Sequence, residues 1–237
     1  MKDIRARPAS HKNKSGARTR QAIDAFFDLL QDPRVGDIDP SNRWAVGGFG
    51  YDERTLICRN ILGQLKNRAS LKVEGESRLW ISVLECVSAT GESLPPSIVY
   101  QSMSLQRHEP LVGSQGQIRE RYISAEEEEL SLDQIALQWL EKIFVPFTTP
   151  SQGGDPPLLI LDDHASYKAE DFLWTCFQNN ILLLFLPERA SDVLQPLHMA
   201  VSEQLRAAYK KVIPDFVISR AAAGTKRLFL TAYFEAR

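Results

Sequence analysis

The residues with the clearest chemical potential follow directly after an apolar run of strand length. Residues 158–161, Leu-Leu-Ile-Leu, end abruptly in Asp162, Asp163 and His164. A buried strand that carries an aspartate at its carboxyl end holds the carboxylate rigidly at the edge of a sheet, which suits a metal ligand. Asp162 could instead cap the strand end as a turn residue, because aspartate is frequent there. The neighbouring carboxylate and imidazole favour the functional interpretation.

The elements that must position these residues follow from hydrophobic periodicity. A hairpin that leads into alternating helices and strands predicts an α/β fold, in which a mixed sheet carries helices on both faces. Trp139 and Trp174 fall in two of the helices and are predicted to belong to the core. The strands are expected over residues 43–51, 79–87, 95–100, 158–161 and 181–186, and the helices over residues 18–30, 131–144, 169–179 and 199–212.

Composition places the chain in an ordinary class of globular proteins. It has 237 residues, of which 43% are hydrophobic and 24% charged, and these values are typical of a water-soluble domain. No apolar run reaches membrane-spanning length, so no membrane partner is expected. Cys58, Cys86 and Cys176 are widely spaced and form no CxxC pair. Neither a zinc site nor a disulfide framework is therefore indicated, and an intracellular compartment is expected.

The charge is distributed unevenly along the chain. Net charge is −2, yet the first 20 residues hold seven basic side chains against Asp3 alone. A basic start of this kind can bind phosphate backbones or act as a nuclear import signal. A solvated, disordered tail is an equally good interpretation of the same residues.

Several segments, taken in order, match one known family in residue type and spacing. They are Tyr51-Asp52-Glu53, where the family has N-x-D-E-x-G-F; residues 80–91 with Leu94-Pro95-Pro96; residues 159–166; the block from Asn179 to Leu197; and residues 206–211. From about residue 18 to residue 237 the chain thereby resembles the DDE-superfamily endonuclease domain of pogo-like transposases, in the Tc/mariner superfamily. The resemblance implies a ribonuclease-H-like fold, which agrees with the predicted order of elements.

The resemblance also divides the chain into four parts. Residues 1–17 are expected to form a basic disordered tail, and residues 18–40 an amphipathic helix and linker. The endonuclease domain would span residues 41–213, and residues 214–237 would form a truncated C-terminal segment.

By the same resemblance, Asp52, Asp162 and residue 198 are the three acidic positions of the active site. Such a trio implies two Mg²⁺ or Mn²⁺ ions, with Asp52 bridging both, Asp162 binding one and residue 198 binding the other. The two ions would activate the attacking oxygen and stabilise the leaving oxygen of a phosphodiester displacement on DNA.

The third position is occupied by His198. An imidazole presents one softer nitrogen and suits Zn²⁺ or Cu²⁺ better than Mg²⁺. The sequence therefore predicts a degenerate copy whose catalysis is impaired. Asp192 and Glu203 are the nearby acids that could replace the lost ligand, although Glu203 lies more than a turn into the following helix.

Binding of nucleic acid is the other activity that the sequence suggests. His164, Arg206, Lys210 and Lys211 lie beside the implied site and are candidate contacts to DNA. A domesticated, non-catalytic nucleic-acid-binding module and a pseudogene product without a selected role remain as alternatives. The expected partners are DNA and either a second copy of the chain or a transposase chain, and the expected compartment is the nucleus.

Overall fold

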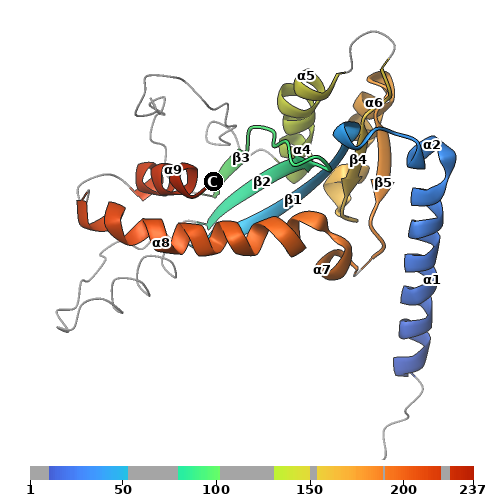
Figure 1. Ribbon diagram of the computed structural model, residues 1–237, viewed down its shortest axis with the longest axis horizontal. Coiled ribbons are helices and arrows are strands. Elements are labelled where there is room, and N and C mark those ends of the chain that lie inside the picture. Colours follow the sequence, from blue (N-terminus) through green and yellow to red (C-terminus); the bar gives the residue numbers. More distant parts are fainter. Residues whose placement is uncertain (1–10, 53–79, 102–130, 150–153, 189, 220–224) are drawn as a thin grey trace, which may run out of the picture.

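A five-stranded mixed sheet forms the centre of the protein (Figure 1). The computed structural model describes residues 11–52, 80–101, 131–149, 154–188, 190–219 and 225–237. The strand order across the sheet is β3-β2-β1-β4-β5. The strands are β1 (Arg43–Asp52), β2 (Trp80–Ser88), β3 (Ser97–Gln101), β4 (Leu158–Leu161) and β5 (Leu182–Phe185).

The pairing of the strands joins an antiparallel half to a parallel half. β3, β2 and β1 pair antiparallel, whereas β1 with β4 and β4 with β5 pair parallel. The turn after β2 contains Gly91 with φ +90°, a conformation that glycine adopts without strain. The predicted hairpin and all five predicted strands are therefore confirmed.

Helices cover both faces of the sheet, as the sequence predicted (Figure 1). α4, α5 and α6 lie on one face, and α8 and α9 lie on the other. The longer helices are α1 (His11–Gln31), α4 (Leu132–Trp139), α6 (Glu170–Gln178), α8 (Glu203–Ser219) and α9 (Thr225–Ala236). Shorter segments are α2 (Pro33–Gly36), η1 (Pro40–Asn42), η2 (Leu140–Phe144), α5 (Val145–Thr148), η3 (Ala165–Lys168), α7 (Ser191–Leu194) and η4 (Leu197–Ser202).

Local signals fix where several of these elements begin and end. Ser131 caps α4: its Oγ accepts from the Gln134 backbone N–H at 3.2 Å, and Gln134 Oε1 accepts from the Ser131 N–H at 2.8 Å. This capping box satisfies two donors that the first helical turn would otherwise leave unpaired. After α6, Asn180 adopts φ 53°, the left-handed conformation that asparagine tolerates at a helix end.

The two ends of the described chain differ from the sequence-based boundaries. α1 begins at His11 and therefore includes residues 11–17, which the sequence predicts to belong to the basic tail. Lysine and alanine in this segment favour a helix. At the other end, α8 runs through residue 213 and α9 follows it, so the predicted domain boundary falls inside a helix.

Three hydrophobic clusters hold the layers together. One lies between the sheet and α4, η2 and α6, and its centre includes the fully buried Trp139 and Phe144. The second joins β1 and β2 to α8 and α9, and the third packs Phe26 of α1 against β4 and β5. The prediction of a core tryptophan is confirmed for Trp139 but is wrong for Trp174, which is 57% exposed on the outer face of α6.

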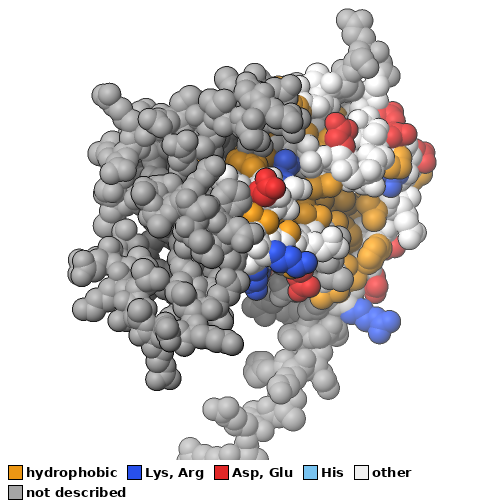
Figure 2. Space-filling view, turned by 60° about the vertical axis from the view of Figure 1, so that its left-hand side comes forward, with side chains coloured by type: hydrophobic (Ala, Val, Ile, Leu, Met, Phe, Trp, Pro, Cys, Tyr) orange, Lys and Arg blue, Asp and Glu red, His pale blue; other side chains and the backbone are white. Residues whose placement is uncertain are grey.

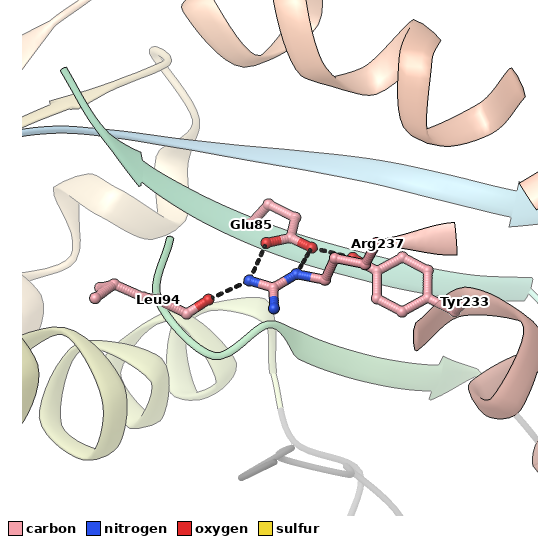
Figure 3. Close-up of polar contacts among 4 residues, drawn as sticks. All are labelled: Glu85, Leu94, Tyr233 and Arg237. Atoms are coloured by element: carbon pink, nitrogen blue, oxygen red, sulfur yellow. Dashed lines mark hydrogen bonds and ion pairs between the residues drawn. The ribbon is translucent and has the colours of Figure 1, made fainter. Parts of the chain in front are cut away.

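A buried carboxylate in β2 anchors the C-terminal helix to the sheet (Figure 3). Glu85 has only 3% of its side chain exposed, and Arg237 Nε lies 3.0 Å from its Oε1. Arg237 also donates to the Leu94 carbonyl at 2.7 Å, and the Tyr233 hydroxyl donates to Glu85. A buried carboxylate is costly unless it is paired, so separating Arg237 and Tyr233 from Glu85 would be unfavourable. These bonds therefore hold residues 225–237 against the sheet.

Replacing Arg237 tests this anchor. Arg237→Leu would leave the buried Glu85 charge without its cationic partner, so the free energy of unfolding should fall by about 2–4 kcal/mol. Urea denaturation of the two proteins measures the difference. Arg34→Leu is the control, because the Arg34–Asp32 ion pair lies at the surface, with 85% of the arginine side chain exposed. An equal shift in the midpoint for both variants would contradict the anchoring role of Arg237.

Candidate functional site

The candidate site is built on Asp162, which directly follows β4, the strand between β1 and the edge strand β5. Leu158, Leu159 and Leu161 of that strand are fully buried, so the backbone that delivers the carboxylate is held firmly. Asp162 is half-buried, and its Oδ1 is buried without a hydrogen-bond partner among the described residues. Burial raises the pKa of Tyr167, and the negative charge of Asp162 raises the pKa further. The phenol and the carboxylate therefore lie close enough for their charges to interact.

The two residues after Asp162 are engaged locally. Asp163 is exposed and forms an ion pair with Lys168 of η3. His164 is exposed as well, and its Nδ1 accepts from the Ser166 backbone N–H at 3.3 Å, which caps η3. These bonds position the turn after β4 and engage both side chains locally.

The first predicted acid lies far from Asp162 along the sheet. β1 and β4 are parallel, in a register that places Ala45 beside Ile160. Continuing both strands by two residues puts Gly47 level with Asp162. Asp52 is the last residue of β1, five residues beyond Gly47, which corresponds to about 16 Å along an extended strand. The backbone of Asp52 is therefore not brought beside Asp162.

The third predicted position lies against β1 at the level of Gly47. Gln195 is 1% exposed, and its Nε2 donates to the Val46 carbonyl at 2.5 Å. Leu197 is buried, and a Cβ added at Gly47 would lie 3.2 Å from the Leu197 Cβ and 3.3 Å from Gln195 Nε2. His198 follows, half-buried, with its backbone N–H donating to the Gln195 carbonyl at 3.1 Å. Position 198 is thus fixed next to the middle of β1.

Neither neighbouring acid is shown to replace the missing ligand. Glu203 is exposed at the first turn of α8, and the side chain of Asp192 lies outside the described residues. Within the described part of the chain, no three His, Cys, Asp or Glu side chains come close enough together to hold a metal ion. Rescue of the third position by either acid therefore stays a prediction.

The donor set at this place does not fit the two hard divalent ions that DDE nucleases generally use. Asp162 offers one buried oxygen without a partner, which suits a single ligand. Gly47 offers no side chain, and His198 offers an imidazole where hard Mg²⁺ requires oxygen. Two closely spaced Mg²⁺ or Mn²⁺ ions need several anionic oxygens, and the described residues supply one carboxylate.

The predicted basic contacts lie on α8, the helix that follows position 198. Arg206, Lys210 and Lys211 are exposed, whereas Leu205 and Tyr209 turn the opposite side of the helix into the core. On the face shown in Figure 2, basic and acidic side chains are interspersed around a hydrophobic area. The described surface in that view therefore carries no extended patch of a single charge.

Sequence reasoning missed Gly47, Gln195 and Tyr167 as parts of this region. Gln195 bears on the site through its hydrogen bond to Val46 of β1, and the buried Tyr167 through the charge of Asp162. No local pattern in the sequence reveals either. Gly47 had a signal, because three glycines within β1 are unusual in a central strand. That signal marks the close approach of Leu197 to β1.

Comparison with known proteins gives one family match. The family described as DDE superfamily endonuclease matches residues 77–229, well over half of the chain. The match contains Asp162 and position 198, while Gly47 and Asp52 precede it.

None of the described helices combines the length and apolarity that crossing a membrane requires.

A curated protein and a solved structure are among those similar to the chain. The "MFS-type transporter clz9" of Cochliobolus lunatus is 26% identical over 191 residues, which cover 78% of this chain and 20% of the relative. The chain thus spans about a fifth of that relative's length. A chain in the structure of a simian T-cell lymphotropic virus intasome with the PP2A regulatory subunit B56 gamma has 9% identity and a TM-score of 0.41, covering 82% of this chain and 48% of that chain.

Proposed function

The chain belongs to the DDE superfamily endonuclease family, and we propose that it is a pogo-like transposase domain that binds DNA with little or no remaining cleavage. The family implies DNA as the substrate, and it implies phosphodiester cleavage as the ancestral reaction. We propose further that the chain acts in the nucleus, as part of a homodimer or beside a transposase partner chain.

The observation that carries this proposal is the donor set around Asp162. Among the described side chains, Asp162 is the one carboxylate where β4, the middle of β1 and the segment Leu197–His198 meet. A two-metal displacement requires anionic oxygens on both ions, because each ion must offset charge that develops on the phosphate. With His198 in the third position, the described side chains at this place lack the anionic oxygens that a second ion would need.

Binding of DNA is supported by the position of α8. Arg206 and Lys210 lie four residues apart and therefore share one face of the helix, with Lys211 beside them. All three are exposed, and the helix begins five residues after His198. Exposed lysine and arginine bind phosphates without reading sequence, so we expect non-specific, salt-dependent binding.

Plasmid nicking in Mg²⁺ or Mn²⁺ tests the loss of cleavage. The unmodified chain should nick supercoiled DNA no faster than Asp162→Asn, which removes the remaining carboxylate while preserving the shape of the side chain. The same comparison for His198→Asp shows whether one substitution restores activity, and we expect that it does not. Cutting by the unmodified chain well above the rate of Asp162→Asn would contradict the proposal.

Salt-dependent anisotropy with a labelled duplex tests the binding role of α8. Lys210→Gln should weaken binding and reduce the slope of log K against log salt by about one, because one phosphate contact is lost. Lys142→Gln is the matched control, since Lys142 is also exposed but belongs to η2, on the other face of the sheet. Equal effects of the two substitutions, or no binding by the unmodified chain, would contradict the proposed interface.

A further inference from the structure

We infer that Gly47, and not Asp52, occupies the position of the first metal ligand, so that two of the three ligands are missing from this chain. The inference rests on the proposed origin of the domain as a two-metal nuclease. The missing ligands are carboxylate oxygens that would bind a hard divalent cation. His198 is then the second of two positions at which a carboxylate has been replaced.

The register of the parallel strands β1 and β4 places position 47, and not position 52, beside Asp162. A pair of ligands on adjacent parallel strands can share an ion when the two residues are level, because neighbouring strands lie about 4.8 Å apart. The register that pairs Ala45 with Ile160 puts position 47 level with Asp162. Position 52 lies about 16 Å further along β1, well beyond the reach of two carboxylates around one ion.

The segment that carries position 198 contacts β1 at Gly47. The Cβ direction of Gly47 points to Leu197 and to the amide of Gln195, at 3.2 and 3.3 Å. Gln195 is itself held by its bond to the Val46 carbonyl, the residue next to Gly47. A side chain at position 47 would therefore point toward the start of η4, the element that carries His198.

The buried polar atoms of the region support the same assignment. Asp162 Oδ1 and Gln195 Oε1 are both buried without hydrogen-bond partners among the described residues. Buried acceptors are normally satisfied, so unpartnered oxygens on either side of one glycine need an explanation. A cation held between position 47 and Asp162 would satisfy the carboxylate oxygen.

The spacing of the residues in β1 agrees independently. With the first D of the motif N-x-D-E-x-G-F at position 47, its Gly-Phe pair falls on Gly50 and Tyr51. With that D at Asp52, the pair would fall on Thr55 and Leu56. An aromatic residue after a glycine is retained in the first alignment and lost in the second.

The test is a Mn²⁺ titration, followed by the electron paramagnetic resonance signal of free Mn²⁺, on the full chain and its variants. Gly47→Asp/His198→Asp should bind Mn²⁺ at least about tenfold more tightly than the unmodified chain, since even supporting groups around a metal contribute that much. Gly47→Asn/His198→Asn has the same shapes without the charges and should not gain affinity. Adding Asp52→Ala to the first variant should leave its affinity unchanged.

Two results would overturn the assignment of Gly47. The first is that His198→Asp alone binds Mn²⁺ as tightly as Gly47→Asp/His198→Asp does. The second is that Gly47→Asp/His198→Asp loses its gained Mn²⁺ affinity when Asp52→Ala is added. The melting temperature of Gly47→Ala measures how much the crowding by Leu197 destabilises the fold when the side chain at position 47 carries no charge. If Gly47→Asp/His198→Asp does not fold, adding Leu197→Ala makes room for the new side chain, and the same two results decide.

The same samples separate this inference from the proposed function. Failure to gain Mn²⁺ affinity, together with salt-dependent DNA binding by the unmodified chain, refutes the assignment and leaves the proposed function standing. Gained Mn²⁺ affinity without any DNA binding by the unmodified chain supports the assignment and refutes DNA binding as the present function.

Discussion

The parallel pairing of β1 with β4 is the constraint on which the site depends. It fixes which residue of β1 stands beside Asp162, and the close contact of Leu197 with Gly47 then fixes where His198 lies. When a strand is buried on both faces, the packing of its side chains specifies its register. A shift of one residue would move every side chain to the opposite face of the sheet. The identity of the residues at the site therefore follows from the core.

The proposed loss of acidic ligands is compatible with a stable fold because the supports of the sheet lie elsewhere. The three hydrophobic clusters and the Glu85–Arg237 pair involve neither Asp162 nor His198. Several carboxylates close together repel one another when no cation is bound, so an active site of this kind costs stability. A glycine and a histidine in two of the positions remove that repulsion while the surrounding packing is kept.

The sequence predicted the fold class, the hairpin and every strand because those features depend on local periodicity. It also singled out Asp162 as a candidate ligand, since an aspartate after a buried strand is a local signal. It did not predict that Gly47 stands opposite Asp162, because register is set by packing between residues more than a hundred positions apart. Trp174 was misjudged for a related reason, as an apolar neighbourhood along the chain does not show which helix face is covered.

The central claim is the register itself, and an engineered disulfide tests it most directly. In a chain with Cys58, Cys86 and Cys176 replaced by alanine, mild oxidation of Gly47→Cys/Asp162→Cys should give an intrachain disulfide, because the Cα atoms of level residues on adjacent strands lie within bridging distance. Asp52→Cys/Asp162→Cys should remain reduced, since those residues are about 16 Å apart along the strand direction. A disulfide in the second variant, and none in the first, would contradict the account.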